Sequence, residues 1–367
     1  MKGLGIYVHV PFCVRKCGYC DFLSFPADEG VQRRYVERLL EEMEESRGLA
    51  LMYEVATVFI GGGTPSILEG RWIEEILWRL QEIYRVREDA EITIEANPGT
   101  VDAEKLGIYQ ALGINRISFG LQSTVDAELE RLGRIHSYGE FLESFGLARE
   151  AGFENINVDL MSALPGQSLG SWCEGLERVA GLLPEHISAY SLMIEEGTDF
   201  YRRYGEHPEC LPSEDEERRM YEQTGEILKG WGYGQYEISN YAREGYACRH
   251  NLGYWERAEY KGYGLGAASL LQDVRSVNQT DLKEYLKGNF AGSEERLSER
   301  DIREEYFFLG LRKTEGIDPG IYGMHYEKLI KKLQMQQLLG EKDGKIFLTR
   351  KGIDVSNYVL AQFLDDR

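Results

Sequence analysis

Apolar and polar residues follow two different periods along the first half of the chain. Short runs of β-branched and other apolar residues predict six strands, at residues 6–10, 55–60, 91–95, 114–119, 156–160 and 187–192. Between them, apolar residues at helical spacing predict helices at residues 31–47, 72–84, 103–112, 138–151 and 171–183. Strands separated by single helices form right-handed βαβ units and a parallel sheet. Six such units match a partial (β/α)6 barrel. A Rossmann sheet is the alternative, and periodicity does not separate the two.

The pattern changes after the sixth predicted strand. Residues 195–212 are rich in Gly, Pro, Tyr and charge, which predicts a long loop. Ser213 in the N-cap position and Glu216 three residues later form a capping-box pattern, so we expect a helix at residues 213–230. Residues 233–268 are unusually rich in Tyr, Gly, Asn and His.

The last part of the chain differs again. Here we expect two helices, at residues 302–311 and 326–339, then a hairpin that turns at Asp343-Gly344, then a final helix. That order resembles a winged-helix module. DNA binding and a packing or partner-docking role are both open for it, and we favour the second. The predicted division is residues 1–232, a connecting region 233–298 and a C-terminal domain 299–367.

Composition and charge narrow the function classes. The chain has 367 residues, 43% hydrophobic and 28% charged, an ordinary composition for a globular protein with a large core. Lys and Arg number 42 against 62 Asp and Glu, a formal net charge of −20, which argues against nucleic-acid binding. Residues 299–367 carry 12 basic and 12 acidic side chains, so the whole excess lies in residues 1–298. With no apolar run near the ~18 residues of a membrane span and no secretory h-region, we expect a cytoplasmic protein.

Three of the six cysteines cluster directly after the first predicted strand. Cys13, Cys17 and Cys20 have the spacing C-x3-C-x2-C, and without an export signal they indicate metal ligands rather than disulfides. Three thiolates on one loop can hold three irons of a [4Fe–4S] cluster and leave the fourth iron open for another ligand. A zinc site or reactive thiols are the alternatives. Zinc usually takes a fourth ligand from a second Cys/His pair, and no such pair follows the loop.

With this cysteine loop, the sequence resembles the radical S-adenosylmethionine (radical SAM) superfamily. Within it, the chain is similar to the oxygen-independent coproporphyrinogen III oxidase-like family over nearly its whole length. The resemblance implies a partial (β/α)6 radical-SAM barrel with a small C-terminal winged-helix-like domain. It also implies a [4Fe–4S] cluster on the three cysteines, with SAM bound to the open iron through its amino and carboxylate groups. Reduction would then cleave SAM to a 5′-deoxyadenosyl radical.

The resemblance also implies residues that hold SAM. Polar side chains at the carboxyl ends of parallel strands converge on one face, which is the usual ligand face of such sheets. Taken singly, each of these residues is also explained as a cap or a surface residue. The residues that match the family are Tyr7, Tyr19, Gly62, Gly63, Thr64, Glu95, Gln122, Arg134, Asp159, Ser191 and Ala268. The three from the glycine-rich turn would bind the methionine amino group, the carboxylates the ribose hydroxyls, and the arginine the SAM carboxylate.

Two departures from the oxidase pattern favour the heme-chaperone branch of this family. Phe22 stands where the oxidases carry a further cysteine, and the N-terminal arm of the oxidases is absent before the first strand. The branch implies a protein that binds heme and delivers it to acceptor proteins, with an electron donor as a further partner. A true coproporphyrinogen III oxidase, which converts propionates to vinyl groups, is the alternative. Whether the protein is an enzyme is therefore left open.

A third feature agrees with the chaperone branch. His250 begins a His-Asn-x-x-Tyr-Trp motif, which resembles the signature of that branch. Imidazole is a common axial ligand of heme iron, and aromatic neighbours suit a flat apolar macrocycle. We therefore expect His250 to ligate or position heme or a related porphyrin. A packed, hydrogen-bonded histidine is the alternative, and Cys248 is either a second heme contact or a small buried side chain.

Overall fold

The computed structural model describes residues 1–364. Its first half contains six βα units, as the sequence predicts. The parallel strands are β1 (Lys2–Val10), β2 (Tyr53–Gly62), β3 (Val86–Ala96), β4 (Arg116–Gln122), β5 (Ile156–Ser162) and β6 (His186–Ser191). The helices between and after them are α1 (Glu29–Glu45), α2 (Gly70–Ile83), α3 (Ala103–Ala111), α4 (Asp126–Leu132), α5 (Tyr138–Glu150) and α6 (Leu169–Ala180).

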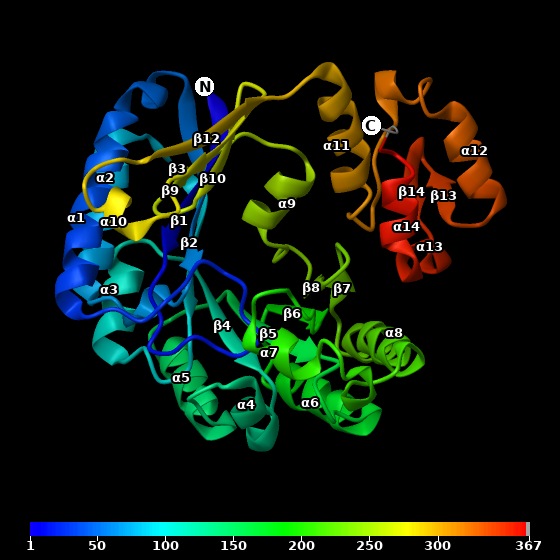
Figure 1. Cartoon of the computed structure of the whole chain (residues 1–367), viewed down its shortest axis with the longest axis horizontal. Helices are drawn as coiled ribbons and strands as arrows, with labels where there is room; N and C mark the ends of the chain where they lie inside the picture. The colour runs from blue at the N-terminus through cyan, green and yellow to red at the C-terminus, as the bar shows by residue number, and fades with distance from the viewer. Residues whose placement is uncertain (365–367) are drawn as a thin grey trace.

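A single large sheet runs through the molecule. Its strand order is β12-β11-β10-β9-β1-β2-β3-β4-β5-β6-β8-β7, with β1 to β6 parallel neighbours in chain order. Helices α1 to α6 lie along the outer side of the curved sheet in Figure 1. The carboxyl ends of the six strands therefore face one edge, where the connecting loops can build a ligand site.

The segment after β6 contains four helices, α7 to α10, and short strands that extend the sheet at both edges. Its elements are α7 (Asp199–Tyr204), α8 (Glu214–Gly230), β7 (Gly234–Gln235), β8 (Asn240–Ala242), α9 (Arg249–Trp255), β9 (Tyr260–Tyr263), β10 (Ala268–Leu271), β11 (Val274–Asn278), α10 (Leu282–Tyr285) and β12 (Ala291–Arg296). Strand β9 is parallel to β1, and β8 is antiparallel to β6. Side chains of this segment, such as Tyr263 and Tyr285, belong to the main hydrophobic core. Helix α9 packs against β2 and lies in the middle of Figure 1.

A second hydrophobic core is formed by side chains from Phe307 to Phe363. The elements around it are α11 (Glu299–Gly310), α12 (Glu327–Met335), β13 (Leu339–Lys342), β14 (Lys345–Leu348), α13 (Arg350–Asp354) and α14 (Ser356–Ala361). Asp343 and Gly344 both have positive φ, 53° and 77°, which is the backbone of a tight two-residue hairpin turn. The winged-helix-like order is therefore confirmed, with the final helical segment split in two. The three-part division of the chain stays a prediction.

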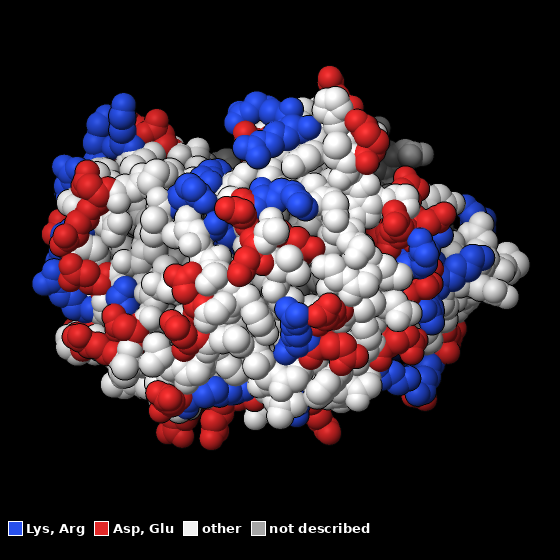
Figure 2. Space-filling model, turned by 90° about the horizontal axis from the view of Figure 1, so that it is seen from below, with Lys and Arg blue, Asp and Glu red and all other residues white. Residues whose placement is uncertain are grey.

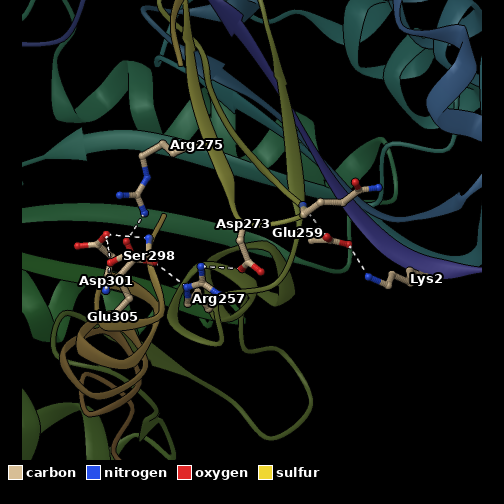
Figure 3. A network of polar contacts seen from close by, with 9 residues as sticks. Lys2, Arg257, Glu259, Asp273, Arg275, Ser298, Asp301 and Glu305 are labelled. Carbon is tan, nitrogen blue, oxygen red and sulfur yellow. Dashed lines mark hydrogen bonds and ion pairs between the residues drawn. The ribbon is translucent and has the colours of Figure 1, made fainter. Parts of the chain in front are cut away.

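Buried charges join α11 to the extended edge of the sheet (Figure 3). Glu305 on α11 has a side chain only 6% exposed, and it accepts hydrogen bonds from Arg257 and Arg275, each at 2.6 Å. Arg257 also pairs with Asp273 at 3.0 Å. Ion pairs therefore connect the C-terminal elements to the segment that follows α9, in addition to the covalent connection.

The structure departs from the sequence-based expectations in two places. The predicted loop at 195–212 is wrong in part, because it contains α7. This short helix is capped by Thr198 and buries Phe200, a tertiary contact that local composition does not reveal. Helix α4 was not predicted, because seven residues are too few for helical periodicity to stand out. The helix expected after Ser213 is confirmed with its capping box. Short 3-10 helices cover Arg47–Leu51, Pro65–Ile67, Pro208–Cys210 and Gly320–Tyr322.

Acidic and basic side chains lie interspersed on the face that Figure 2 shows. Within residues 1–364, no helix is both long enough and apolar enough to cross a membrane.

Candidate functional site

The three clustered cysteines lie on one loop between β1 and α1. The Thr64 hydroxyl donates a hydrogen bond to the Cys13 sulfur at 3.6 Å, and the Arg134 guanidinium donates to the Cys17 sulfur at 3.7 Å. Cys20 lies on the same loop, and its backbone N–H donates to the carbonyl of Cys17. Donors beside a sulfur stabilise its charged form, because hydrogen bonds to the thiolate favour it over the thiol. Burial nevertheless raises the pKa of the Cys13 and Cys20 thiols, and hydrogen bonds such as that from Thr64 to Cys13 act against this effect. The donors would stabilise the thiolates of a bound metal centre.

The loop could in principle hold either a single metal ion or a cluster. Within the described residues, no three Cys, His, Asp or Glu side chains lie close enough to hold one metal ion. A structural zinc site needs four ligands around one ion. A cubane cluster binds each cysteine on a different iron, so its ligands stand further apart. The three thiols on one loop have the donor chemistry of a [4Fe–4S] cluster, and their coordination stays a prediction.

A cavity of about 320 Å³ opens between this loop and the carboxyl ends of the parallel strands. This volume suits a ligand of the size of SAM. The predicted site residues that line it are Cys13, Cys17, Cys20, Tyr19, Gly62, Gly63, Thr64, Glu95, Gln122, Arg134 and Asp159. The structure thus brings together most of the residues that the resemblance implies for the cluster and SAM. Their roles remain predictions.

The glycine-rich turn after β2 allows a close approach of the backbone to the cysteine loop. Gly62 has φ 116°, a conformation that other residues rarely adopt. A Cβ atom at Gly63 would lie 2.5 Å from the carbonyl oxygen of Phe12, so only glycine fits there. Neither position has a side chain of its own to cover its carbonyl, while the two amides already donate to the Glu95 carboxylate and to the Val10 carbonyl.

Two buried carboxylates lie deeper in the cavity. Glu95, at the end of β3, accepts a hydrogen bond from the backbone N–H of Gly62 at 3.0 Å. Burial, and then the neighbouring charge of Asp159, raise the pKa of Glu95 to about 7. Burial also raises the pKa of Asp159, although the side chains of Ser188 and Asn157 hydrogen-bond to its charged form. Glu95 is therefore part protonated near neutral pH, whereas an exposed glutamate would be fully ionised.

We expect the affinity for SAM to rise with pH through the neutral range. The resemblance implies that Glu95 binds the ribose, and its ionised form would accept hydrogen bonds from the ribose hydroxyls. The population of this form grows from about a tenth near pH 6 to about nine-tenths near pH 8. The expected gain is about fivefold to tenfold, measured by anaerobic titration calorimetry of the reconstituted protein. In Glu95→Gln the profile should be flat. A wild-type profile as flat as that of the variant would contradict this role.

A chain of hydrogen bonds orders one wall of the cavity, and its central member was missed by sequence reasoning. The Arg134 guanidinium donates to the Asn97 side-chain oxygen at 2.5 Å, and the Asn97 amide nitrogen donates to the Thr64 hydroxyl at 2.7 Å. Thr64 in turn donates to Cys13, as described above. Asn97 follows β3 two residues after Glu95. That position at the end of a parallel strand is the signal that could have found it.

Gln122 adopts a strained backbone at the end of β4. Its φ is 72°, in the left-handed region, where residues other than Gly are uncommon. The Tyr190 hydroxyl donates to the Gln122 side-chain oxygen at 2.9 Å, and both residues line the cavity. Tyr190 was also missed by sequence reasoning. Such strain is retained where the surrounding structure holds it, often at ligand sites.

Four of the predicted residues lie away from the cavity wall. Tyr7, on β1, is half-buried, with its hydroxyl 2.9 Å from Nδ1 of His9. Ser191 lines a separate hollow beside α8, and Ala268 lies on β10, paired with Val277. His250 lies against a different cavity. Tyr7, Ser191, Ala268 and His250 are thus not among the described residues that line this cavity, and their roles stay predictions.

His250 is buried, 4% exposed, beside a second cavity of about 300 Å³. Its Nδ1 is 2.8 Å from the Thr57 hydroxyl and its Nε2 is 3.0 Å from the Tyr254 hydroxyl. The ring stacks on Phe59 at 5.3 Å between centroids. Burial, and then the charge of Arg116, lower the pKa of His250 to about 3, so the imidazole is neutral. In this conformation both ring nitrogens are engaged, which matches the packed, hydrogen-bonded alternative.

Comparison with known proteins identifies the family of the chain. Residues 7–179 match the model of the Radical SAM superfamily. The chain is 35% identical to the "Heme chaperone HemW" of Bacillus subtilis, over 98% of this chain and 99% of that protein. It is 40% identical to the "Heme chaperone HemW" of Escherichia coli, over 85% of this chain and 83% of that protein.

One solved structure covers almost the whole chain. It is the coproporphyrinogen III oxidase HemN from Escherichia coli, described as a radical SAM enzyme, with a TM-score of 0.84 and 24% identity over 99% of this chain and 90% of that one. This likeness confirms the fold: α/β, with a radical-SAM sheet of six βα units followed by the C-terminal module. Because the chain is 35% and 40% identical to these two HemW proteins over 98% and 85% of its length, it belongs to the HemW-type branch of the radical SAM coproporphyrinogen III oxidase-like family.

Proposed function

We propose that this protein is a heme chaperone of the radical SAM type, which binds heme and transfers it to acceptor proteins in the cytoplasm. The observation that carries the proposal is the similarity to HemW over 98% of the chain, a span that includes the His250 motif and the C-terminal module. Cys13, Cys17 and Cys20 would hold a [4Fe–4S] cluster, and the adjoining cavity would hold SAM. When bound, the two together supply a reducible centre and a source of radicals.

The chain's own residues would then position SAM. The turn at Gly62 and Gly63 offers backbone groups to the methionine amino group, and Arg134 offers a charged donor to the carboxylate. Glu95 would accept from the ribose. A hollow of about 740 Å³ lies on the outer side of the cysteine loop, and Cys17 lines both this hollow and the cavity. An electron donor protein would thus reach the cluster from outside without entering the SAM cavity.

Heme transfer is the test of the chaperone function. Heme-loaded protein is mixed with an apo-cytochrome, and transfer is followed by absorbance. The expected result is transfer faster than passive release of heme, which is measured with a scavenger protein that makes no specific contact. Equal rates for the cytochrome and the scavenger would contradict a chaperone role.

We infer that His250 is the axial ligand and that heme binding needs a local rearrangement. The neutral imidazole is the form that binds iron, but Nε2 faces the Tyr254 hydroxyl. The cavity beside it is smaller than a heme macrocycle. Helix α9 must therefore move away from β2, and the hydrogen bonds of His250 must open, before heme iron reaches the ring.

Substitution of the histidine should weaken heme binding. For His250→Ala we expect an affinity loss of at least about tenfold and a shifted Soret band, because the axial nitrogen is gone. The measurement is an absorbance titration with heme. His207→Ala, which changes an exposed histidine, is the matched control and should bind as the wild type does. Unchanged affinity and an unchanged spectrum in His250→Ala would remove the ligand role.

A coproporphyrinogen III oxidase is the second candidate, and the whole-chain likeness to the fold of HemN favours it. Against it stands Phe22, which replaces a cysteine of the oxidase motif and lies 64% exposed at the edge of the cavity. Anaerobic incubation with coproporphyrinogen III, reductant and SAM separates the two candidates. Protoporphyrinogen formed with repeated turnover would establish the oxidase function. No product beyond a single turnover would exclude it.

A further inference from the structure

Helix α9, which carries His250, is held at its N-terminal end by a buried carboxylate. Glu91 on β3 is 7% exposed and accepts hydrogen bonds from the backbone N–H groups of Arg249 at 2.9 Å and His250 at 3.0 Å. A helix cannot pair these first N–H groups within itself, and negative charge is favoured beside them. The start of α9 is therefore fixed to the central sheet.

The residues that follow α9 are joined to the C-terminal module by two ion pairs. Arg257 lies two residues beyond the helix, and its guanidinium donates to the Glu305 carboxylate of α11 at 2.6 Å (Figure 3). The two side chains are 13% and 6% exposed, so solvent screens this pair little. Glu256 pairs at 2.9 Å with Lys313, which follows α11 and has a side chain 10% exposed. Both pairs hold the C-terminal end of α9 to the module.

A third contact at the same end involves the last residue of the helix. The guanidinium carbon of Arg312 lies 4.7 Å from the ring centroid of Trp255, which is a cation–π contact. Trp255, Glu256 and Arg257 are consecutive, and their partners all belong to α11 or to the residues directly after it. We call these three interactions the α11 contacts. Helix α9 thus lies between β2 and α11 and touches both (Figure 1).

The two ends of α9 are not equivalent. The Glu91 end joins β3, which lies inside the large sheet, whereas α11 contributes to the separate hydrophobic core of the C-terminal module. A helix fixed at both ends moves away from its support only when one end is released. The end at the module is the one that can separate without opening the main core.

We propose that Glu305 and Lys313 are positioning residues, which hold α9 against β2 and so limit the access of heme to His250. This inference rests on the proposed function, in which heme binding needs α9 to move. While the α11 contacts are intact, the histidine stays in its packed position. Only the fraction of molecules with α9 released binds heme, so both the association rate and the apparent affinity are reduced by that fraction.

The test measures heme association with the full-length protein by stopped-flow absorbance in the Soret region. Lys313→Met removes the charge and keeps most of the side-chain volume. Glu305→Gln keeps the shape of the side chain and removes the charge that faces Arg257. Both variants should bind heme about fivefold faster than the wild type, because each weakens the closed state. The final Soret band should stay at the wild-type position, since His250 is unchanged.

Lys345→Met is the matched control. Lys345 lies on β14 of the same module, is 44% exposed and pairs with Glu315 at 3.3 Å. Lys313 also pairs with Glu315, at 3.2 Å. The control therefore removes an ion pair of the module that does not involve α9, and it should bind heme at the wild-type rate. A control as fast as the two variants would overturn the proposal, because loosening of the module would then be sufficient.

Hydrogen exchange of the backbone amides of α9, measured without heme, separates this inference from the proposed function. Exchange should be about fivefold faster in both variants than in the wild type and the control. Unchanged exchange and unchanged heme association in the variants would overturn the role of the α11 contacts and leave the heme function standing. A wild type that binds no heme would contradict the proposed function, while the exchange rates would still decide whether α11 holds α9. If circular dichroism shows that one variant is unfolded, the other variant decides the result.

Discussion

Each of the variants Cys13→Ala, Cys17→Ala and Cys20→Ala is expected to lose the iron–sulfur cluster almost completely. Each cysteine would hold a different iron of the proposed cluster, so no remaining ligand on the loop could replace it. The wild type should carry about four irons per chain after anaerobic reconstitution, and each variant close to none. Iron and sulfide analysis, with the broad visible absorbance of the cluster, measures this directly.

The other cysteines of the chain provide matched controls. Cys173→Ala and Cys210→Ala change thiols that lie away from the loop, and they should keep the full iron content. The loss of one clustered cysteine should leave the rest of the fold intact, because all three side chains are only partly buried. A variant of the triplet that retains about four irons would contradict the assignment of that cysteine as a ligand.

The second large effect is expected in the ion-pair network at α11. In Glu305→Ala, Arg275 loses its carboxylate partner and Arg257 keeps only Asp273. Both guanidinium groups then remain in a partly buried place with less compensating charge. Breaking a buried pair by removing one partner costs about 3 kcal/mol in free energy of unfolding. Urea denaturation followed by circular dichroism, with linear extrapolation, measures the change.

The control for that variant is an exposed ion pair that is also drawn in Figure 3. Lys2 pairs with Glu259 at 3.4 Å, and the Lys2 side chain is 71% exposed. Because solvent screens such a pair, Lys2→Ala should change the free energy of unfolding by less than about 1 kcal/mol. Equal effects of the two substitutions would contradict a stabilising role for the buried network.

Sequence reasoning reached the site where its signals are local. The spacing of Cys13, Cys17 and Cys20 is contained in one short loop after a strand, and the glycine-rich turn follows the next strand directly. Glu95 ends a predicted strand, Asp159 lies at the end of another, and Gln122 follows a third. Parallel strands bring their carboxyl ends together, so the position of each residue along its own strand was enough to place it at the cavity.

Sequence reasoning did not reveal tertiary contacts between segments that lie far apart in the chain. Asn240, which also lines the cavity, lies on a strand of three residues, too short for an alternating pattern. Ser191 also ends a strand, and it lines a separate hollow beside α8. The resemblance pointed to His250 as a heme ligand, but only the packing of α9 on β2 shows that both of its ring nitrogens are engaged.

By itself, the amino-acid sequence determined the six βα units, the cysteine loop and the family of the protein, because periodicity and motif spacing are properties of short segments. The tertiary structure decided how far the sheet extends, because β9 pairs with β1 across most of the chain length and no local pattern encodes that pairing. It also decided which polar side chains share the cavity. Those neighbours are set by strand register and helix packing, which depend on the whole core at once.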